Sequence, residues 1–269
     1  MRVLFLGDVV GNIGCESVNI YLPKIIKKNK IDFVIVNGEN AGQQGVGITE
    51  KICNDLFSIG VDVITTGNHI WDEKEIISFI PKEKRLLRPQ NLVENSPGNG
   101  FGIFEIKNLN MKVAVINLMG NIFMKKCDDA FEAATKFIKK IKLKKDADFI
   151  VVDMHGEITS EKMAMGHFFD GSSTCVVGTH THVPTADTRI LEKGTAYQTD
   201  IGMCGDYNSV IGMNAKNSIN KFYKRDSIKN FPAEGEASLC GAIIEANPKN
   251  GLASNISQFI FGGQLQKDN

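Results

Sequence analysis

The chain has 269 residues, 42% of them hydrophobic and 23% charged, and its 31 basic side chains balance 31 acidic ones. This composition is typical of a globular protein and excludes disordered and fibrous classes. With no net charge, the chain has no overall field that attracts nucleic acid or an anionic membrane, so any affinity for phosphate must be local. The length suits one large α/β unit, and we expect a single domain over residues 1–269.

The N-terminal apolar run is short and is interrupted by Gly7 and Asp8, unlike the longer apolar core of a signal peptide. No run reaches the roughly eighteen apolar residues of a membrane span. The six cysteines are scattered without a C-x-x-C pair, which favours reduced, mostly buried thiols. These features predict a cytoplasmic protein that does not bind membranes.

Short apolar runs rich in β-branched residues recur along the chain and predict buried strands. Because they are apolar on both faces, they are typical of a parallel sheet covered by helices. The runs occupy residues 3–6, 32–36, 61–66, 111–118, 148–153 and 174–178.

Candidate helices lie between these runs. Pro23 should kink or split the first helix, Thr49 is a suitable N-cap for the second, and Asp72 with Glu75 has capping-box spacing at the start of the third. The predicted helices cover residues 17–28, 49–59, 72–80, 128–141 and about 160–167.

Antiparallel strands are expected at three places. Residues 98–118 predict a hairpin that turns at 108–110, and residues 186–200 alternate around a turn. A further strand pair is expected at 238–246 and 257–261. Parallel βα units should therefore dominate the first half of the chain and antiparallel strands the second half.

The segment 214–236 is the most polar and least patterned part of the chain. A solvated surface excursion is the favoured interpretation, with a substrate lid or a subunit contact as the alternatives. Since no apolar stripe marks an interface, the sequence leaves open whether the protein is a homo-oligomer.

Metal-competent side chains follow five of the predicted strands, each at the point where the strand ends. The carboxyl ends of parallel strands share one edge of a sheet, so these side chains should converge. Each alone has an ordinary explanation as a cap, a turn residue or a core histidine, but their corresponding positions weigh against coincidence. The residues are Asp8, Glu39, Asn40, Asn68, His69, His155, His180 and His182.

In order and spacing this series resembles the motifs of calcineurin-like metallophosphoesterases. The histidine of the usual D-x-H motif is missing after Asp8, and Glu39 with Asn40 replaces the usual aspartate. With these departures and the segments 37–49 and 199–213, the chain resembles the YmdB-type bacterial branch over nearly its whole length. The resemblance implies a four-layer α/β/β/α sandwich of two mixed sheets flanked by helices. It also implies a two-metal centre and phosphodiesterase activity toward cyclic nucleotides, notably the 2',3'-cyclic forms and also the 3',5'-cyclic forms.

The same matching assigns seven side chains to two metal ions and an eighth to proton transfer. One ion would be held by Asp8, Asn40 and His182, the other by Asn68, His155 and His180, with Glu39 as the bridge. His69 would be the general acid for the departing ribose oxygen, and a metal-bridging hydroxide would be the nucleophile. A shell of nitrogen and oxygen suits iron or manganese, and zinc is also compatible.

The backbone around the paired histidines is expected to be extended, because a side-chain period of two would then point His180 and His182 the same way. A ligand histidine usually donates its second N–H to a carboxylate or carbonyl. Candidate carboxylate partners are Glu157, Asp187 and Asp200. Trp71 and Tyr207 could stack on a base, although packing is the more common role of such aromatics.

Two other functions are compatible with the same residues. One is a phosphomonoesterase or phosphoprotein phosphatase with the same metal centre. The other is a metal- or nucleotide-binding regulatory protein, against which the Asn68-His69 pair argues because a sensor needs no proton donor. The expected partner in the leading interpretation is a small cyclic nucleotide, without stable binding of nucleic acid.

Overall fold

Two six-stranded sheets form the body of the protein in the computed structural model, which describes residues 1–106, 109–223 and 229–265. The first sheet has the order β12-β11-β10-β1-β2-β3. Its strands β1, β2, β3 and β10 run parallel, whereas β11 pairs antiparallel with β1, β10 and β12. The strands are β1 Arg2–Val9, β2 Phe33–Asn37, β3 Val63–Thr65, β10 Met203–Asp206, β11 Ala237–Ala246 and β12 Ala253–Phe261.

The second sheet has the order β4-β5-β6-β7-β9-β8. Its centre is parallel, and the edge strands β4 and β8 are antiparallel to their neighbours. Both sheets are therefore mixed. The strands are β4 Phe101–Ile106, β5 Met111–Met119, β6 Phe149–His155, β7 Cys175–Thr179, β8 Arg189–Ile190 and β9 Ala196–Gln198.

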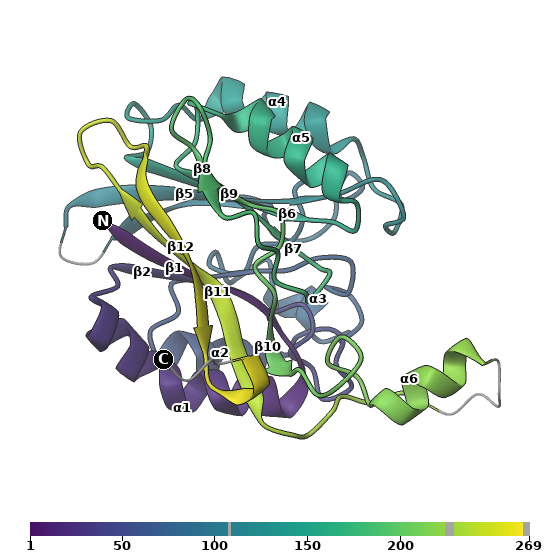
Figure 1. The fold of residues 1–269 in the computed structure, drawn as a ribbon. Coiled ribbons are helices and arrows are strands. Elements are labelled where there is room, and N and C mark those ends of the chain that lie inside the picture. Colours follow the sequence, from purple (N-terminus) through teal and green to yellow (C-terminus); the bar gives the residue numbers. More distant parts are fainter. Residues whose placement is uncertain (107–108, 224–228, 266–269) are drawn as a thin grey trace.

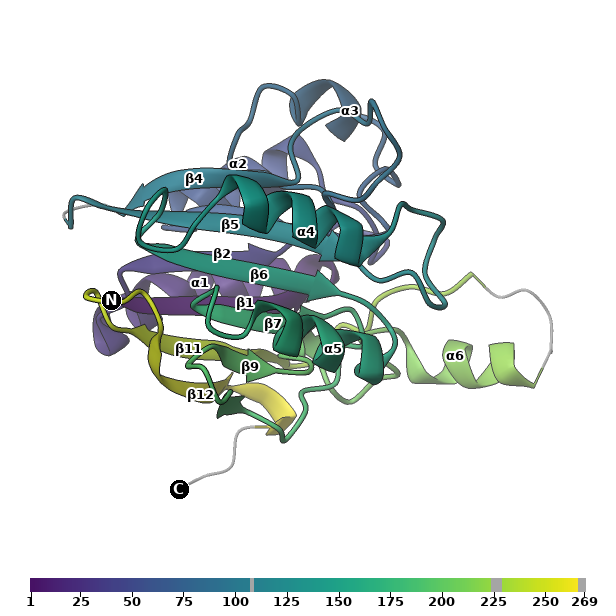
Figure 2. The ribbon, with the colours of Figure 1, turned by 90° about the horizontal axis from the view of Figure 1, so that it is seen from above.

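Helices cover the outer faces of both sheets (Figures 1 and 2). On the first sheet, α1 (Gly11–Asn29) and α2 (Glu50–Ser58) pack over β1, β2 and β3; on the second, α4 (Ala130–Lys140) and α5 (Thr159–Phe169) pack over β5, β6 and β7. The layer order is that of the predicted α/β/β/α sandwich of two mixed sheets, which is confirmed.

Strand β1 illustrates why these sequences form buried strands. Leu4 and Leu6 face the helices of the first sheet, where they share a core with Val18 and Leu22 of α1. Val3 and Phe5 point the other way, into the core between the two sheets. Because side chains alternate along a strand, a run that is buried on both faces must be apolar throughout.

Two predicted helices differ from those observed. The first is continuous from Gly11 to Asn29 and contains Pro23 without being split. The third is shorter than expected: α3 covers only Ile76–Phe79, and the predicted capping box is absent. Asp72 instead contacts His69, and Glu75 accepts a hydrogen bond from the backbone N–H of Glu50.

The predicted antiparallel pairs are present as β4–β5, β8–β9 and β11–β12. Part of the expected hairpin turn, residues 107–108, lies outside the described residues. The polar segment 214–236 contains one described helix, α6 (Ala215–Phe222), which extends away from the two sheets (Figures 1 and 2). A short 3-10 helix, Gly263–Leu265, follows β12.

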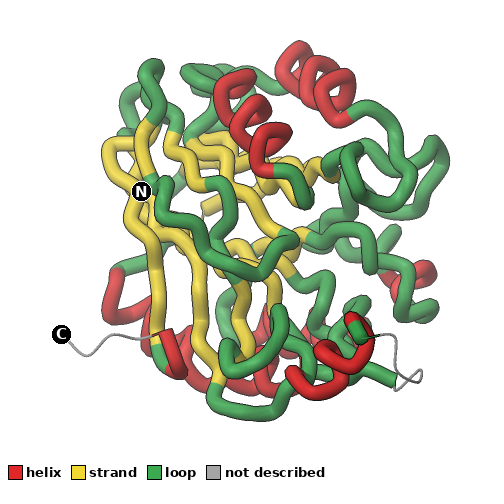
Figure 3. Tube along the Cα trace, turned by 45° about the vertical axis from the view of Figure 1, so that its right-hand side comes forward, coloured by secondary structure: helices red, strands yellow, loops and turns green. Residues whose placement is uncertain are grey.

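Loops gather beyond the strand ends, on the side of the molecule that carries α6 (Figure 3). The parallel strands of both sheets end there. In the first sheet Asp8 near the end of β1 pairs with Asn37 at the end of β2, and in the second His155 at the end of β6 pairs with Thr179 at the end of β7. Within the described parts of the chain, none of the helices is long and apolar enough to cross a bilayer.

Candidate metal centre

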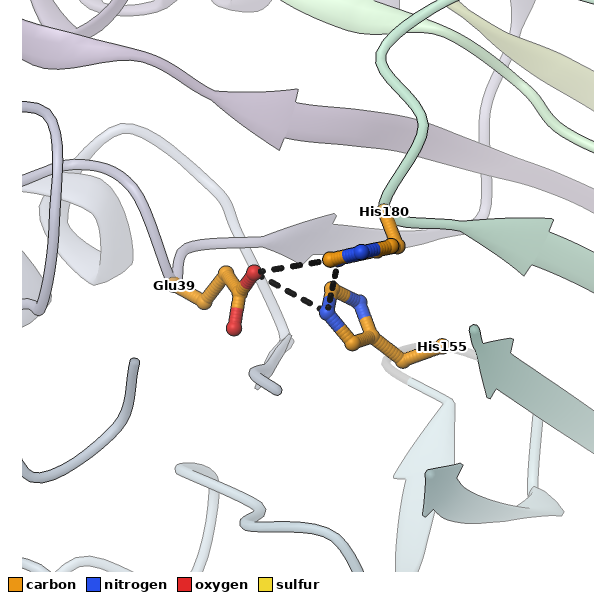
Figure 4. A group of neighbouring side chains, drawn as sticks. All are labelled: Glu39, His155 and His180. Atoms are coloured by element: carbon orange, nitrogen blue, oxygen red, sulfur yellow. Dashed lines mark hydrogen bonds and ion pairs between the residues drawn. The ribbon is translucent and has the colours of Figure 1, made fainter. Parts of the chain in front are cut away.

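Three side chains, each from beyond the end of a different strand, meet around His155, the last residue of β6, and Figure 4 shows two of them, Glu39 and His180. His155 Nε2 lies 2.9 Å from Glu39 Oε1, 3.2 Å from Asn68 Oδ1 and 3.1 Å from His180 Nδ1. Glu39 and His155 are buried, and His180 is partly exposed. The structure thus brings together one of the two predicted ligand groups with the predicted bridging carboxylate.

The hydrogen bonds on the Nδ1 side of His155 indicate which ring nitrogen carries a proton. Thr179 Oγ1 donates to Asp153 Oδ1 at 2.7 Å, so the same oxygen accepts from His155 Nδ1 at 2.9 Å. With one proton fixed on Nδ1, Nε2 is the nitrogen that faces Glu39, where it can donate a second proton to the carboxylate or, without that proton, offer a lone pair to a cation. Asn37 completes this network by donating from Nδ2 to Asp153 Oδ2 at 3.1 Å.

The other two histidines are oriented in the same manner. His180 Nε2 lies 3.2 Å from Glu157 Oε2, and His182 Nδ1 lies 2.8 Å from the carbonyl oxygen of Ile211. Each can donate its N–H to that oxygen and keep the lone pair of its other nitrogen for the centre. This arrangement is typical of metal-ligating histidines, whose second nitrogen is fixed by an oxygen acceptor.

A second group of acceptor atoms forms around His182. Its Nε2 lies 3.3 Å from Asn40 Oδ1 and 3.8 Å from Asp8 Oδ1. Asn40 donates its own amide hydrogen to the carbonyl of Gly45, so its oxygen remains directed at the histidine. These three residues are the ones predicted to form the shell of the other ion.

The two groups adjoin each other. Asp8 Oδ2 accepts the backbone N–H of His180 at 3.1 Å, and Asp8 Oδ1 is 3.9 Å from His155 Nδ1. On the other side, Glu39 Oε2 accepts the backbone N–H of His69 at 3.0 Å. All eight side chains predicted from the sequence therefore lie at one edge where the two sheets meet.

The donor chemistry of this edge fits divalent cations. Asp8 Oδ1 is buried and has no hydrogen-bond partner among the described residues. Burial raises the pKa of Asp8 to about 7, which shows that the protein interior alone solvates this charge poorly. Burial also raises the pKa of Glu39, but the charge of protonated His155 and the hydrogen bonds that His155 and His180 donate outweigh it and hold that pKa well below its usual range. Where these histidines give up the protons that they share with Glu39, lone pairs of carboxylate, amide and imidazole face one another, and a hard or borderline cation is what such a set binds.

Gly67 makes room for this centre. A Cβ atom at this position would overlap His155 Nε2 and Glu39 Oε2. The loop after β3 can therefore approach the cluster closely enough to deliver Asn68 only if residue 67 lacks a side chain.

The backbone at the paired histidines differs from the expected extended chain. His180 has φ 99° and His182 has φ 67°, so the chain turns at both residues. Positive φ is unfavourable for residues with a side chain and persists where the surroundings over-determine it. The turn, rather than a strand period of two, sends His180 to one acceptor group and His182 to the other.

Hydrogen bonds hold this turn at three successive residues. Asp8 accepts the N–H of His180, Asp200 Oδ2 accepts the N–H of Thr181 at 3.1 Å, and Tyr207 donates its hydroxyl to the carbonyl of His182 at 3.0 Å. Asp200 thus acts on the backbone, so the prediction that it partners an imidazole is wrong. Tyr207 likewise uses its hydroxyl on the backbone, since it also accepts the N–H of Met203.

The other residues predicted to lie near the centre differ in what they contact. Glu157 contacts His180 as expected. Among the described residues, Asp187 contacts no histidine and accepts hydrogen bonds from Thr185, Thr199 and Arg189. Trp71 packs against the apolar core of the first sheet.

His69 lies beside the two acceptor groups without joining either. Its Nδ1 is 2.6 Å from Asp72 Oδ2, and Asp72 Oδ1 is 3.3 Å from Lys125 Nζ. The contact with Asp72 favours a proton on Nδ1 and leaves Nε2 as the nitrogen that can exchange a proton with a ligand. This role for Asp72 accounts for the missing capping box.

Several residues of the centre were not found from the sequence. Asn37, Asp153 and Thr179 support His155, and Lys162 pairs with Asp200. The polar ends of two otherwise apolar strands, Asn37 on β2 and Asp153 on β6, were the available signal, because a buried polar residue needs a partner.

A pocket of about 440 Å³ opens onto the centre. Its wall on the centre's side contains Glu39, Asn40, His69, Glu157, His180, Thr181 and His182, and its other wall is formed by Gly45, Val46, Val210, Ile211, Met213, Ser218, Lys221, Phe222 and Asn230. A small molecule in this pocket would have the candidate metal ligands at one end.

Comparisons with known proteins agree with this geometry. The family model described as "YmdB-like protein" matches residues 4–259. A Bacillus subtilis (strain 168) protein named 2',3'-cyclic-nucleotide 2'-phosphodiesterase is 45% identical over 261 residues, which cover 97% of each chain.

Two solved structures are similar over almost their whole length. A hypothetical protein from Thermus thermophilus has a TM-score of 0.90 and 37% identity, covering 98% of this chain and 100% of that one. A protein described as a novel phosphatase from Mycoplasma pneumoniae has a TM-score of 0.89 and 36% identity, covering 97% of this chain and 93% of that one. The region matched by the family model includes all eight side chains that the sequence predicts at the centre.

Proposed function

This chain belongs to the YmdB-like protein family, and on that premise we propose that it is a metal-dependent phosphodiesterase that hydrolyses 2',3'-cyclic nucleotides. The observation that carries the proposal is the convergence of histidine nitrogens with buried carboxylate and amide oxygens in two adjoining groups. The name of the Bacillus relative supports the substrate class. The 3',5'-cyclic nucleotides are included as further candidate substrates.

We assign the residues around the centre to two ions, as the sequence predicts. Asp8, Asn40 and His182 would hold one, and Asn68, His155 and His180 the other, with Glu39 between them. Bound metal ions supply a water nucleophile that is acidic enough to ionise near neutral pH and charge that neutralises the reacting phosphate. Iron or manganese suits this nitrogen and oxygen shell, and zinc is compatible with it.

The protein's own groups would orient the substrate and move the proton. The pocket places a ligand against Glu39, His180 and His182 at one end, with His69 in the same wall. Opening of the cyclic phosphate forms one phosphorus–oxygen bond from water and breaks one phosphorus–oxygen bond to the ribose, and the departing ribose oxygen needs a proton. His69 Nε2 can donate that proton while Asp72 holds Nδ1. The product is a nucleoside monophosphate.

The test combines metal analysis of the purified protein with assays of His69→Ala. We expect about two metal ions per chain in both proteins, since His69 is not a ligand. Loss of the general acid should lower kcat for 2',3'-cyclic AMP about 100- to 10,000-fold. One ion or none in the wild-type protein, or full diesterase activity in the variant, would contradict the mechanism.

A phosphomonoesterase is the second candidate, because the similar Mycoplasma pneumoniae structure is described as a phosphatase. Comparison of 2',3'-cyclic AMP, 3',5'-cyclic AMP, bis(p-nitrophenyl) phosphate and p-nitrophenyl phosphate separates the two. A preference for the monoester would overturn the proposed substrate class and leave the metal centre in place.

A regulatory protein that acts without turnover is the third candidate. Glu39→Gln removes the proposed bridging charge and should abolish hydrolysis. If that variant still rescued a deletion phenotype completely, binding rather than catalysis would be the relevant function.

A further inference from the structure

The pocket beside the centre has two chemically different ends. One end carries the ionisable and amide side chains of the centre. The other carries the aliphatic side chains of Val46, Val210, Ile211 and Met213 and the aromatic ring of Phe222. A nucleotide has the same division, with an anionic phosphate at one end and a flat, largely apolar base at the other.

The size of the pocket agrees with a ligand of this kind. Pockets for small molecules usually have volumes of about 300–1,000 Å³, and this one has about 440 Å³. A phosphate group alone would occupy only the polar end. The apolar wall would then remain in contact with water, which is unfavourable for such side chains.

Two of the apolar side chains are unusually exposed for their size. Phe222 is 82% exposed and Ile211 is 52% exposed. A ligand that covered both would remove apolar surface from water at the same time as it met the centre. Aromatic rings at such positions stack on nucleobases of any type, because every base has a π-face.

The backbone holds Ile211 in this place. Ile211 has φ 50°, which is strongly disfavoured for a β-branched residue. Paired hydrogen bonds between Val210 and Met213 close the turn, and the carbonyl of Ile211 faces His182 Nδ1 at 2.8 Å. The turn that orients a candidate metal ligand therefore also fixes the side chain at the apolar end of the pocket.

The pocket also contains a polar group that lacks a partner. Asn230 donates from Nδ2 to Ser218 Oγ at 3.1 Å, whereas its Oδ1 is buried and has no hydrogen-bond partner among the described residues. Both residues line the pocket. An unpaired buried amide oxygen is costly, and an N–H on the edge of a base would satisfy it.

From these observations we infer that Ile211, Phe222 and Asn230 form a nucleobase subsite, with the two apolar side chains against the face of the base and Asn230 at its edge. The inference rests on the proposed function, because it takes the phosphate to lie at the centre. The subsite would let the protein bind nucleotides in preference to phosphodiesters that have no base.

The test compares two substrates that share the reacting group. One is 2',3'-cyclic AMP, and the other is the 2',3'-cyclic phosphate of 1-O-methyl ribose, which has no base. We expect Phe222→Ala to lower the ratio of kcat/KM for the nucleotide to kcat/KM for the base-free diester about tenfold, as expected for the loss of one stacking contact. Asn230→Ala should lower the same ratio.

Ile219→Ala is the matched control, since Ile219 is a half-exposed apolar residue of α6 that does not line the pocket. This variant should keep the wild-type ratio. A ratio within about twofold of wild type for Phe222→Ala, or an equal fall for Ile219→Ala, would overturn the subsite.

An equilibrium measurement separates failure of the subsite from failure of the proposed function. If the wild-type protein hydrolyses neither diester, the proposed function fails, and calorimetric titration with adenosine 3'-monophosphate still tests the subsite. The subsite predicts about tenfold weaker binding to Phe222→Ala than to Ile219→Ala. Equal affinity would overturn it.

Discussion

Lys162 and Asp200 form an ion pair in the interior, with Nζ 2.7 Å from Oδ2 and both side chains only 1% exposed. The same Asp200 oxygen accepts the N–H of Thr181, between the paired histidines. Asp200 Oδ1 accepts the N–H of Gly202. A lysine on α5 thus neutralises the carboxylate that holds the ligand turn.

Lys162→Met should destabilise the protein by about 3–5 kcal/mol, because it leaves Asp200 as a buried, unpaired charge. Urea unfolding measures this loss. The double variant Lys162→Met/Asp200→Asn should recover part of it, since the charge is removed and an amide oxygen can still accept from Thr181. A single variant within about 1 kcal/mol of wild type would contradict this account of the pair.

Thr179→Val should weaken metal binding about 10- to 100-fold, because the hydroxyl that fixes the proton of His155 on Nδ1 is lost. Titration of metal-free protein with Mn²⁺ measures the affinity. Thr174→Val is the matched control: Thr174 is a buried threonine whose hydroxyl bonds to the backbone of Ile150 and Gly251, away from the centre. If both variants lost affinity equally, the effect would be a general one on the sheet.

Gly67→Ala should displace His155 or Glu39 and reduce the metal content, since its Cβ would overlap both side chains. Elemental analysis of the purified variant gives the content directly. Gly156→Ala provides the comparison, because a Cβ there would meet its neighbours only at ordinary contact distances, with Gly120 Cα at 3.5 Å. Retention of the full metal content by Gly67→Ala would show that the loop can withdraw without affecting the centre.

Asp72→Asn should lower kcat for 2',3'-cyclic AMP at least about tenfold, as expected when a general acid is less well oriented. Bis(p-nitrophenyl) phosphate is the internal comparison, because nitrophenolate departs without needing a proton. Its kcat should fall much less. An equal fall for both substrates would place Asp72 in support of the metal centre instead of His69.

The contribution of Asp187 to stability should depend on pH. Burial raises the pKa of Asp187, but hydrogen bonds from Thr185 and Thr199 and the charge of Arg189 outweigh it and lower that pKa below its ordinary 3.8. A lowered folded-state pKa stabilises the protein above the unfolded-state pKa, and this stabilisation is lost as the pH falls through the folded-state value.

The difference in unfolding free energy between wild type and Asp187→Asn should therefore be constant from pH 7 to about 4 and shrink below that. Urea unfolding at several pH values checks it. A difference that grew on acidification would have the wrong sign.

Much of the fold was predictable because local patterns determine it. Apolar runs located β1, β2, β3, β5, β6 and β7, although the short strand β10 was not predicted. Thr49 does cap α2 by accepting the N–H of Ile52. The candidate ligands were predictable for the same reason, since each stands where an apolar strand ends. Their convergence followed from the parallel arrangement of the strands.

The supporting network depends on contacts between distant parts of the chain. Thr179 meets His155 because β6 and β7 pair in that register, which no local pattern specifies. Asp72 had the spacing of a helix cap but is used by His69, so tertiary contact overrode the local preference. The turn at His180 and His182 was missed because its unfavourable φ angles depend on Asp8, Asp200 and Tyr207.

The segment that carries α6 leaves and rejoins the molecule at adjacent points, where the N–H of Asn214 donates to the carbonyl of Phe231 at 2.9 Å. We therefore expect that the residues between them can be replaced as one unit without changing the sheet edge that bears the eight polar side chains. Other segments could be inserted between Asn214 and Phe231, and the resulting variants could be selected for new ligand preferences while the candidate metal ligands stay the same.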